Sequence, residues 1–163
     1  IKFGGKNEIY LVRQTPIGEL TIVEENSKIT NIIFENQGKN FDKKNCIQKE
    51  TPILQKTCRQ LAEYFAKERT CFSIPLAPDG TEFLQKVWKA LEKIPYGETR
   101  SYKEIAEQIN HPKAYRAVGM ANNKNPIPII IPCHRVISSS DTLTGYAGGL
   151  DIKSFLLELE QRI

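Results

Sequence analysis

Several residue types are scarce in this 163-residue sequence, which has four cysteines, two histidines and one methionine. No C-x-x-C pair occurs, and both histidines lie far downstream of the first three cysteines, which argues against a zinc site. A chain of this size without a secretory signal is not expected to depend on disulfides, so the predicted compartment is reducing. We expect Cys46, Cys58 and Cys71 to be small, half-buried apolar side chains.

Long apolar runs are also absent. No stretch reaches the roughly 18–20 consecutive apolar residues that a membrane-spanning helix needs, and residues 1–6 lack the apolar core of a signal peptide. With 40% hydrophobic and 26% charged residues, the composition is that of an ordinary globular protein. These features predict a cytoplasmic protein, or a nuclear one in a eukaryote, with no membrane partner.

Acidic residues are missing from one long segment. The net charge is only +4, but residues 108–140 contain the cations Lys113, Arg116, Lys124 and Arg135 and no Asp or Glu. Such a segment can lie near phosphates without like-charge repulsion. An ordinary solvated surface explains the same pattern equally well.

The first half of the chain has the alternating, β-branched pattern that is typical of strands. The apolar residues after Pro52 recur instead at helical spacing. In chain order, the predicted elements are strands at 8–12, 20–23 and 29–34, a polar loop at 36–45, a helix at 52–67 and a short extended piece at 71–74.

A dense group of turn formers at 77–80 marks the boundary between two domains, predicted at 1–77 and 78–163. Ser101 and Glu104 have the spacing of a capping box, and Pro112 suits the first turn of a helix. The predicted fold class is α+β, with a small strand-rich N-terminal domain and a mostly helical C-terminal domain. Its predicted elements are helices at 81–93, 101–108 and 112–122 and a last helix whose buried stripe is Ile152, Phe155, Leu156 and Leu159.

The two short helices joined by a tight polar turn suggest a helix-turn-helix unit, although such pairs also occur in protein cores without any DNA role. The second of these helices carries the long side chains of Tyr115 and Arg116 between small residues. Small residues allow a backbone to approach a groove wall, but they serve helix packing equally well. These small residues are Ala114, Ala117, Gly119 and Ala121.

Residues 125–136 contain the one cysteine that has a histidine beside it. Three prolines in this segment lack the N–H donor that ladder pairing needs, so a stiff apolar arm is predicted to lead to Cys133. An imidazole such as that of His134 helps to form the thiolate, which is the nucleophilic form of cysteine. Neighbouring side chains in extended backbone point apart, so a tight turn or a bridging water is needed for the pair to act.

The run Pro132-Cys133-His134-Arg135-Val136 resembles the active-site signature of the O6-alkylguanine-DNA alkyltransferases, also called methylated-DNA–protein-cysteine methyltransferases. The resemblance extends from Phe83 to Glu160, and the N-terminal half is compatible with the strand-rich first domain of that family. The further matching motifs are Ile94-Pro95-Tyr96-Gly97-Glu98, Ser101-Tyr102, Arg116-Ala117-Val118-Gly119, Asn125-Pro126 and Gly145-Tyr146-Ala147-Gly148-Gly149-Leu150.

The resemblance implies catalytic roles for five residues. Cys133 accepts the alkyl group carried by guanine O6, and His134 withdraws the thiol proton through a water. Glu160 orients the imidazole, Asn125 braces the turn and Tyr102 donates a hydrogen bond to the departing guanine. Without the resemblance, these last three read as a solvated helix end, an Asn-Pro loop and a half-buried aromatic.

The resemblance also implies how DNA is held. The helix-turn-helix enters the minor groove with little sequence preference, and Arg116 fills the gap left by the extruded nucleotide. Further predicted DNA contacts are Ala114, Tyr115, Ala117, Tyr102, Lys113 and Arg135. The predicted pocket lining is Val136, Ser139, Tyr146, Ala147 and Pro128, and some relatives carry Ser where Ala147 stands. The expected protein is a monomer that needs no metal or organic cofactor and is spent after one transfer, because its product is a thioether.

Three other functions use parts of the same pattern. A DNA-binding regulator needs only the helix-turn-helix and leaves the Cys-His motif unexplained. A Cys-His hydrolase uses the same nucleophile but turns over and has no need of Arg116. A non-catalytic lesion-binding relative is expected to lack the acceptor thiol that Cys133 supplies. Retention of the alkyl label after one equivalent separates transferase from hydrolase, and DNA binding without transfer favours the other two.

Overall fold

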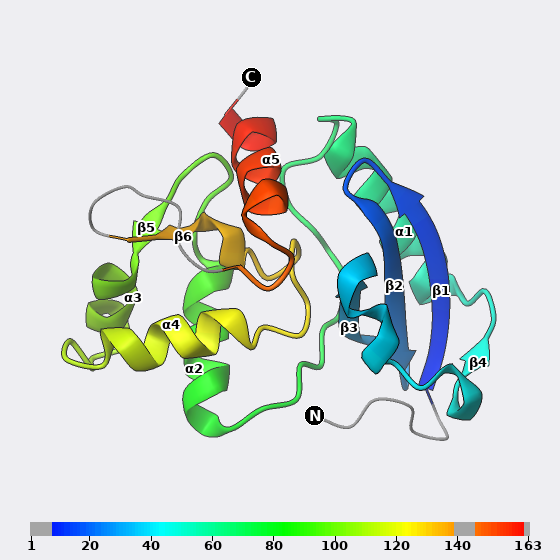
Figure 1. Cartoon of the computed structure of the whole chain (residues 1–163), viewed down its shortest axis with the longest axis horizontal. Helices are drawn as coiled ribbons and strands as arrows, with labels where there is room; N and C mark the ends of the chain where they lie inside the picture. The colour runs from blue at the N-terminus through cyan, green and yellow to red at the C-terminus, as the bar shows by residue number, and fades with distance from the viewer. Residues whose placement is uncertain (1–7, 139–145, 162–163) are drawn as a thin grey trace. The chain divides into compact units, whose positions relative to one another are not determined.

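The computed structural model describes residues 8–138 and 146–161 (Figure 1). The chain forms two compact units, residues 1–79 and 80–163, and the break lies within the turn-rich stretch at 77–80. The first unit carries a sheet and the second is mostly helical, so the fold class is α+β as predicted. Among the described residues, no helix has the length and apolar character to cross a membrane.

The first unit is built on a four-stranded sheet with the order β3-β2-β1-β4. β1 (Glu8–Thr15) and β2 (Gly18–Glu25) form an antiparallel hairpin, and β3 (Lys28–Phe34) pairs antiparallel with β2. These three strands agree with the predicted meander. The short β4 (Ile47–Gln48), which pairs in parallel with β1, was not predicted because two residues show no period.

Both faces of this sheet are covered. Successive strand side chains point to opposite faces, so Ile22 lies with Leu61 of α1 (Pro52–Phe65), whereas Val23 points away from that helix. On the Val23 face, a buried cluster includes Tyr10 and Phe41, whose rings meet edge to face with centroids 5.2 Å apart. A sheet buried on both sides explains why the strands are rich in apolar residues.

Three expectations for this unit are wrong. The segment predicted as a loop at 36–45 contains two 3-10 turns, η1 (Glu35–Asn40) and η2 (Lys43–Asn45). The extended piece at 71–74 is not itself a strand of the sheet: Gln60 of α1 exchanges two hydrogen bonds with Ser73, at 2.9 and 3.0 Å, and the chain pairs with β3 only from Leu76, which bridges in parallel to Ile29. Cys71 is exposed instead of half-buried, while Cys46 and Cys58 are half-buried as expected.

The second unit packs its helices around the buried ring of Trp88, whose Nε1 donates to the Ala121 carbonyl at 3.0 Å. Its elements are α2 (Glu82–Glu92), β5 (Arg100–Ser101), α3 (Tyr102–Gln108), α4 (Tyr115–Asn123), η3 (Cys133–Arg135), β6 (Val136–Ile137) and α5 (Leu150–Gln161). The parallel pair of β5 and β6 places the start of α3 beside the residues that follow η3.

The helix-turn-helix region follows the prediction except at one helix start. The capping box is confirmed: the Ser101 hydroxyl accepts from Glu104 N, and the Glu104 carboxylate accepts from Ser101 N. Pro112 is not in the first turn of α4, because a turn closed by a hydrogen bond from Ala114 N to the His111 carbonyl comes first.

The buried stripe of α5 also differs from the prediction. Leu156 and Leu159 are buried and Ile152 is half-buried, but Phe155 is 38% exposed. Lys153 is completely buried in its place. This helix therefore turns a cation toward the interior, which an apolar period could not predict.

Candidate active site

The site is centred on η3, the 3-10 turn that ends the proline-rich arm. Cys133 N donates to the Ile131 carbonyl at 2.8 Å. A 3-10 turn rotates by roughly 120° per residue, so the side chains of Cys133, His134 and Arg135 point in three directions. All three are buried. The tight turn that the Cys-His pair needs is therefore present.

The arm itself is part of the core. Ile127, Ile129 and Ile131 are each at most 1% exposed. Ile129 has φ +75°, a conformation that a β-branched residue rarely adopts. Strain of this kind persists only where the surrounding packing fixes the backbone, which is the case in the buried arm that leads to Cys133.

Two buried asparagines brace the turn. Asn125 donates from Nδ2 to the Ile131 carbonyl at 2.7 Å, accepts from Ile127 N at 3.0 Å, and hydrogen-bonds to the Cys133 thiol. Asn122 of α4 donates to the Cys133 carbonyl at 3.2 Å. Asn122 was missed by the sequence reasoning, although a polar residue next to Ala121 on the buried side of α4 was a usable signal.

Glu160 joins His134 to the end of α5. Its Oε2 atom lies 2.6 Å from Nε2 of His134, and both side chains are buried. Burial alone would raise the pKa of Glu160, but hydrogen bonds from His134 and Arg135 outweigh it and lower that pKa to about 2. Glu160 is therefore an ionised acceptor and not the solvated helix end that was the plainer interpretation.

Arg135, which the sequence predicts to contact DNA, is bonded to Glu160 in the structure. Its Nε donates to Oε1 of Glu160 at 2.8 Å, one terminal nitrogen donates to Oε2 at 3.0 Å, and the other donates to the Ile94 carbonyl at 2.7 Å. Its guanidinium also lies 5.7 Å from the centroid of the Tyr96 ring. The side chain is buried and directed at Glu160, and it does not lie on the exposed face of α4 with Tyr115 and Arg116.

His134 has a lowered pKa. Burial is the main cause, the hydrogen bond and charge of Glu160 act in the opposite direction, and the positive charges of Arg135 and Lys153 lower it further. Because ionised Glu160 can only accept, the proton of the neutral ring lies on Nε2. Nδ1 is buried, and no described residue gives it a hydrogen-bond partner.

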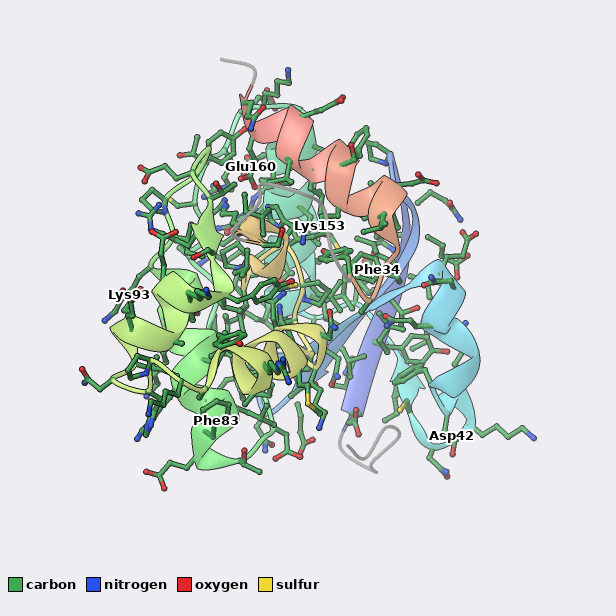
Figure 2. The ribbon with its side chains drawn as sticks, turned by 60° about the vertical axis from the view of Figure 1, so that its left-hand side comes forward. Phe34, Asp42, Phe83, Lys93, Lys153 and Glu160 are labelled. Atoms are coloured by element: carbon green, nitrogen blue, oxygen red, sulfur yellow. The ribbon has the colours of Figure 1, made fainter. Side chains whose placement is uncertain are left out.

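A buried lysine lies near the thiol. Burial raises the pKa of Cys133, against which hydrogen bonds from Asn125 and Tyr146 and the charge of Lys153 act to lower it. Lys153 is fully buried and donates from Nζ to the Val136 carbonyl at 2.7 Å. Figure 2 shows Lys153 and Glu160 on α5, two turns apart. The sequence reasoning missed Lys153, though its seven-residue spacing from Glu160 places both on one helix face.

The exposed side of α4 carries three of the seven predicted DNA contacts. Tyr115, Arg116 and Ala117 are exposed, and the Tyr115 ring lies 6.0 Å from the Arg116 guanidinium and 5.6 Å from the Lys103 ammonium. Met120 on the same helix is 62% exposed, and sequence reasoning did not single it out. Exposed apolar and cationic side chains on one short helix are suited to a groove.

The other predicted residues fall into three groups. Tyr102 is half-buried, with its ring beside Gly119 of α4. Lys113 is exposed and Ala114 is half-buried at the N-cap of α4. Among the predicted pocket residues, Pro128 and Val136 are buried, Tyr146 is half-buried, Ala147 is exposed, and Ser139 lies outside the described residues.

No metal centre is found in the described part of the chain, where no three His, Cys, Asp or Glu side chains are grouped to hold an ion. The groups gathered around Cys133 can remove a proton and stabilise charge.

Comparisons with known proteins match both units. Residues 9–78 match the family described as 6-O-methylguanine DNA methyltransferase, ribonuclease-like domain, and residues 82–162 match its DNA binding domain. The chain is 53% identical to the constitutive methylated-DNA–protein-cysteine methyltransferase of Bacillus subtilis, over 93% of this chain and 94% of that protein. It is 48% identical to the methylated-DNA–protein-cysteine methyltransferase of Methanosarcina acetivorans, over 93% of this chain and 97% of that protein.

A solved structure gives the same result. The crystal structure of Mycobacterium tuberculosis OGT in complex with DNA has a TM-score of 0.87 and 49% identity, covering 94% of this chain and 92% of that one.

Proposed function

The chain belongs to the 6-O-methylguanine DNA methyltransferase family, and on that premise we propose that it repairs DNA by moving the alkyl group of O6-alkylguanine onto Sγ of Cys133. The observation that carries this choice of acceptor is the placement of Cys133 on η3, where Asn125 hydrogen-bonds to its thiol and the next residue, His134, pairs with Glu160. The other three cysteines belong to the first unit.

The reaction is a substitution at carbon. The thiol loses its proton to Nδ1 of His134, through a bridging water as the family resemblance implies. The thiolate attacks the carbon attached to O6: an S–C bond forms, the C–O6 bond breaks, and its electron pair leaves a guanine anion that is carbonyl-like at O6. One proton, equivalent to the one that His134 took from the thiol, then neutralises this anion on the guanine ring. Tyr102 donates a hydrogen bond to this leaving base. The product is a stable thioether, so each protein acts once.

A base is needed because Cys133 is a neutral thiol at rest. Burial raises the thiol pKa, so few molecules hold a thiolate before the substrate arrives. His134, whose pKa is lowered, is neutral near pH 7 and can accept the proton. Ionised Glu160 then stabilises the imidazolium through the 2.6 Å contact.

DNA is bound through α4. Arg116 is exposed and carries a long cationic side chain that is suited to occupy the space of an extruded nucleotide. Asn122 joins this same helix to the Cys133 carbonyl, so the DNA-binding surface and the acceptor are braced together. Minor-groove binding by the exposed face of α4, and with it a salt-sensitive affinity, is part of the proposal.

We also propose that the protein acts as a monomer in the cytoplasm. A thiol acceptor requires a reducing compartment, and the four cysteines of this chain are not paired with one another. The proposed transfer has only two reactants, the Cys133 thiol and the alkylated guanine, so it needs no cofactor.

Transfer of a radiolabelled methyl group from duplex O6-methylguanine tests the acceptor. We expect Cys133→Ala to abolish protein labelling while duplex binding remains, since the thiol is small and buried. Cys71→Ala is the matched control, because it removes an exposed thiol and is expected to label fully. Full labelling of Cys133→Ala would disprove the assignment.

A further inference from the structure

We propose that Arg135 is a positioning residue that holds Glu160 ionised and in place, so that His134 waits as a neutral base with Nδ1 ready to accept the thiol proton. This inference rests on the proposed function, because it concerns the base of the same reaction. It replaces the DNA contact predicted for Arg135 from the sequence.

The clamp between Arg135 and Glu160 is a two-point contact. Nε reaches Oε1 at 2.8 Å, and a terminal nitrogen reaches Oε2 at 3.0 Å, which is the bidentate geometry that fixes the plane of a carboxylate. Oε2 is also the atom that lies 2.6 Å from Nε2 of His134. The orientation of the carboxylate, and with it that of the imidazole, is therefore set by the guanidinium.

Arg135 is itself held by the turn at 94–97. The Ile94 carbonyl accepts from its second terminal nitrogen at 2.7 Å, and the Tyr96 ring lies against the guanidinium. Gly97 has φ +80°, and a Cβ atom there would be 3.3 Å from the Glu160 carbonyl oxygen. Its N–H reaches Oε1 of Glu160 at 3.4 Å. The Ile94–Gly97 turn therefore holds Arg135 and Glu160 in position.

The charge of Arg135 matters as much as its shape. A buried carboxylate beside an imidazole favours the imidazolium form, which has no lone pair to accept a proton. The charged groups that act on His134 are Glu160, which raises its pKa, and Arg135 and Lys153, which lower it. Arg135 is the cation that is bonded directly to Glu160, so its positive charge offsets the effect of the carboxylate charge on the pKa of His134. Without it, we expect the pKa of His134 to rise, although burial continues to lower it.

The test is the titration of His134 by NMR on labelled full-length protein. The chain has only two histidines, and exposed His111 serves as an internal reference. We expect His134 of the unsubstituted protein to titrate below the ordinary histidine value. Titration above that value would overturn the proposal without any variant and without any measurement of alkyl transfer. A failure of the labelling experiment on Cys133 would instead count against the proposed function.

Two variants separate charge from geometry. Arg135→Met removes the cation. We expect the His134 pKa to rise by about 1–3 pH units, and the midpoint of the acidic limb of the pH–rate profile for transfer to shift to higher pH by the same amount. Arg135→Lys keeps a charge but loses the two-point contact, so we expect a low His134 pKa with slower transfer at every pH. Arg69→Met, which removes the Arg69–Glu63 pair in the first unit, is the control and should change neither.

A folded Arg135→Met variant with an unchanged His134 pKa and an unchanged acidic limb would show that Arg135 serves stability alone. Loss of one partner of a buried ion pair is destabilising, so this variant can fail to fold. In that case the His134 titration in the unsubstituted protein and in Arg135→Lys still tests the proposal, because a His134 pKa above the ordinary value in either protein contradicts it.

Discussion

Lys153 of α5 donates from Nζ to the carbonyl of Val136 at 2.7 Å, and this places a completely buried ammonium beside the segment that follows the acceptor cysteine. Burial lowers the pKa of Lys153, whereas a thiolate at Cys133 raises it. The two groups therefore stabilise each other's charged forms. In the proposed reaction, proton removal by His134 would therefore produce a thiolate whose charge Lys153 already partly compensates.

Lys153→Met should make Cys133 less reactive. The thiol pKa, already raised by burial, is expected to rise further when the ammonium is lost. The rate of Cys133 alkylation by iodoacetamide, followed by peptide mass against pH, should therefore fall at neutral pH and recover only at higher pH. Lys89→Met on α2 removes an exposed lysine and is the control. The same pH profile in Lys153→Met and the unsubstituted protein would refute this role.

Glu160→Gln should change the acid stability of the protein. The pKa of Glu160 is about 2 in the folded state and about 4.3 in an unfolded chain, so its contribution is complete above the unfolded value. That contribution is lost as the pH falls from about 4.3 toward 2. Urea unfolding between pH 2 and pH 7 should show lower stability for Glu160→Gln at neutral pH and a shallower decline in acid. Parallel curves would contradict the assignment.

Asn122→Ala should weaken the acceptor turn. The buried carbonyl of Cys133 loses its 3.2 Å hydrogen bond from Asn122, and an unsatisfied buried polar group costs about 1–3 kcal/mol. The free energy of unfolding from urea titration should fall by that amount, and single-turnover transfer should slow. Asn123→Ala changes the exposed neighbour and serves as the control. Equal effects of the two substitutions would contradict the claim that Asn122 stabilises the Cys133 turn.

Arg116→Ala should separate nucleotide extrusion from chemistry. Only duplex DNA requires a nucleotide to leave the stack, so repair of duplex O6-methylguanine is expected to slow more than reaction with free O6-benzylguanine. Single-turnover rates on the two substrates measure the difference. Arg59→Ala in the first unit is a control for the loss of an exposed arginine. Equal losses on both substrates would exclude an extrusion role for Arg116.

Much of the fold was predictable because its signals are local. The hairpin, the third strand, α1 and the capping box at Ser101 follow from period, turn formers and caps. The start of α4 was placed too early because Pro112 is compatible with a helix start but does not require one. The segment at 71–74 does not form a strand, and its Ser73 hydrogen-bonds to Gln60 of α1, a contact that no local pattern predicts.

The site was predictable in its members but not in its charges. The Pro-Cys-His-Arg run predicts Cys133 and His134 as site residues and the same resemblance predicts Glu160, which lies 2.6 Å from His134 in the structure. Arg135 was assigned to DNA because a cation in an acid-free segment looks exposed, and only the fold shows that its acid, Glu160, lies 25 residues away in sequence. Lys153 could not be predicted as a site residue from the sequence, because buried lysines are rare and a lysine is therefore expected on the surface.

The central claim is that Cys133 takes one alkyl group and keeps it. Intact-protein mass after incubation with a duplex that contains one O6-methylguanine, followed by peptide mapping, tests this most directly. We predict a gain of one methyl group that saturates at one per protein and maps to the Cys133 peptide. No gain in mass while the duplex is still bound, or a methyl group on another peptide, would contradict the account.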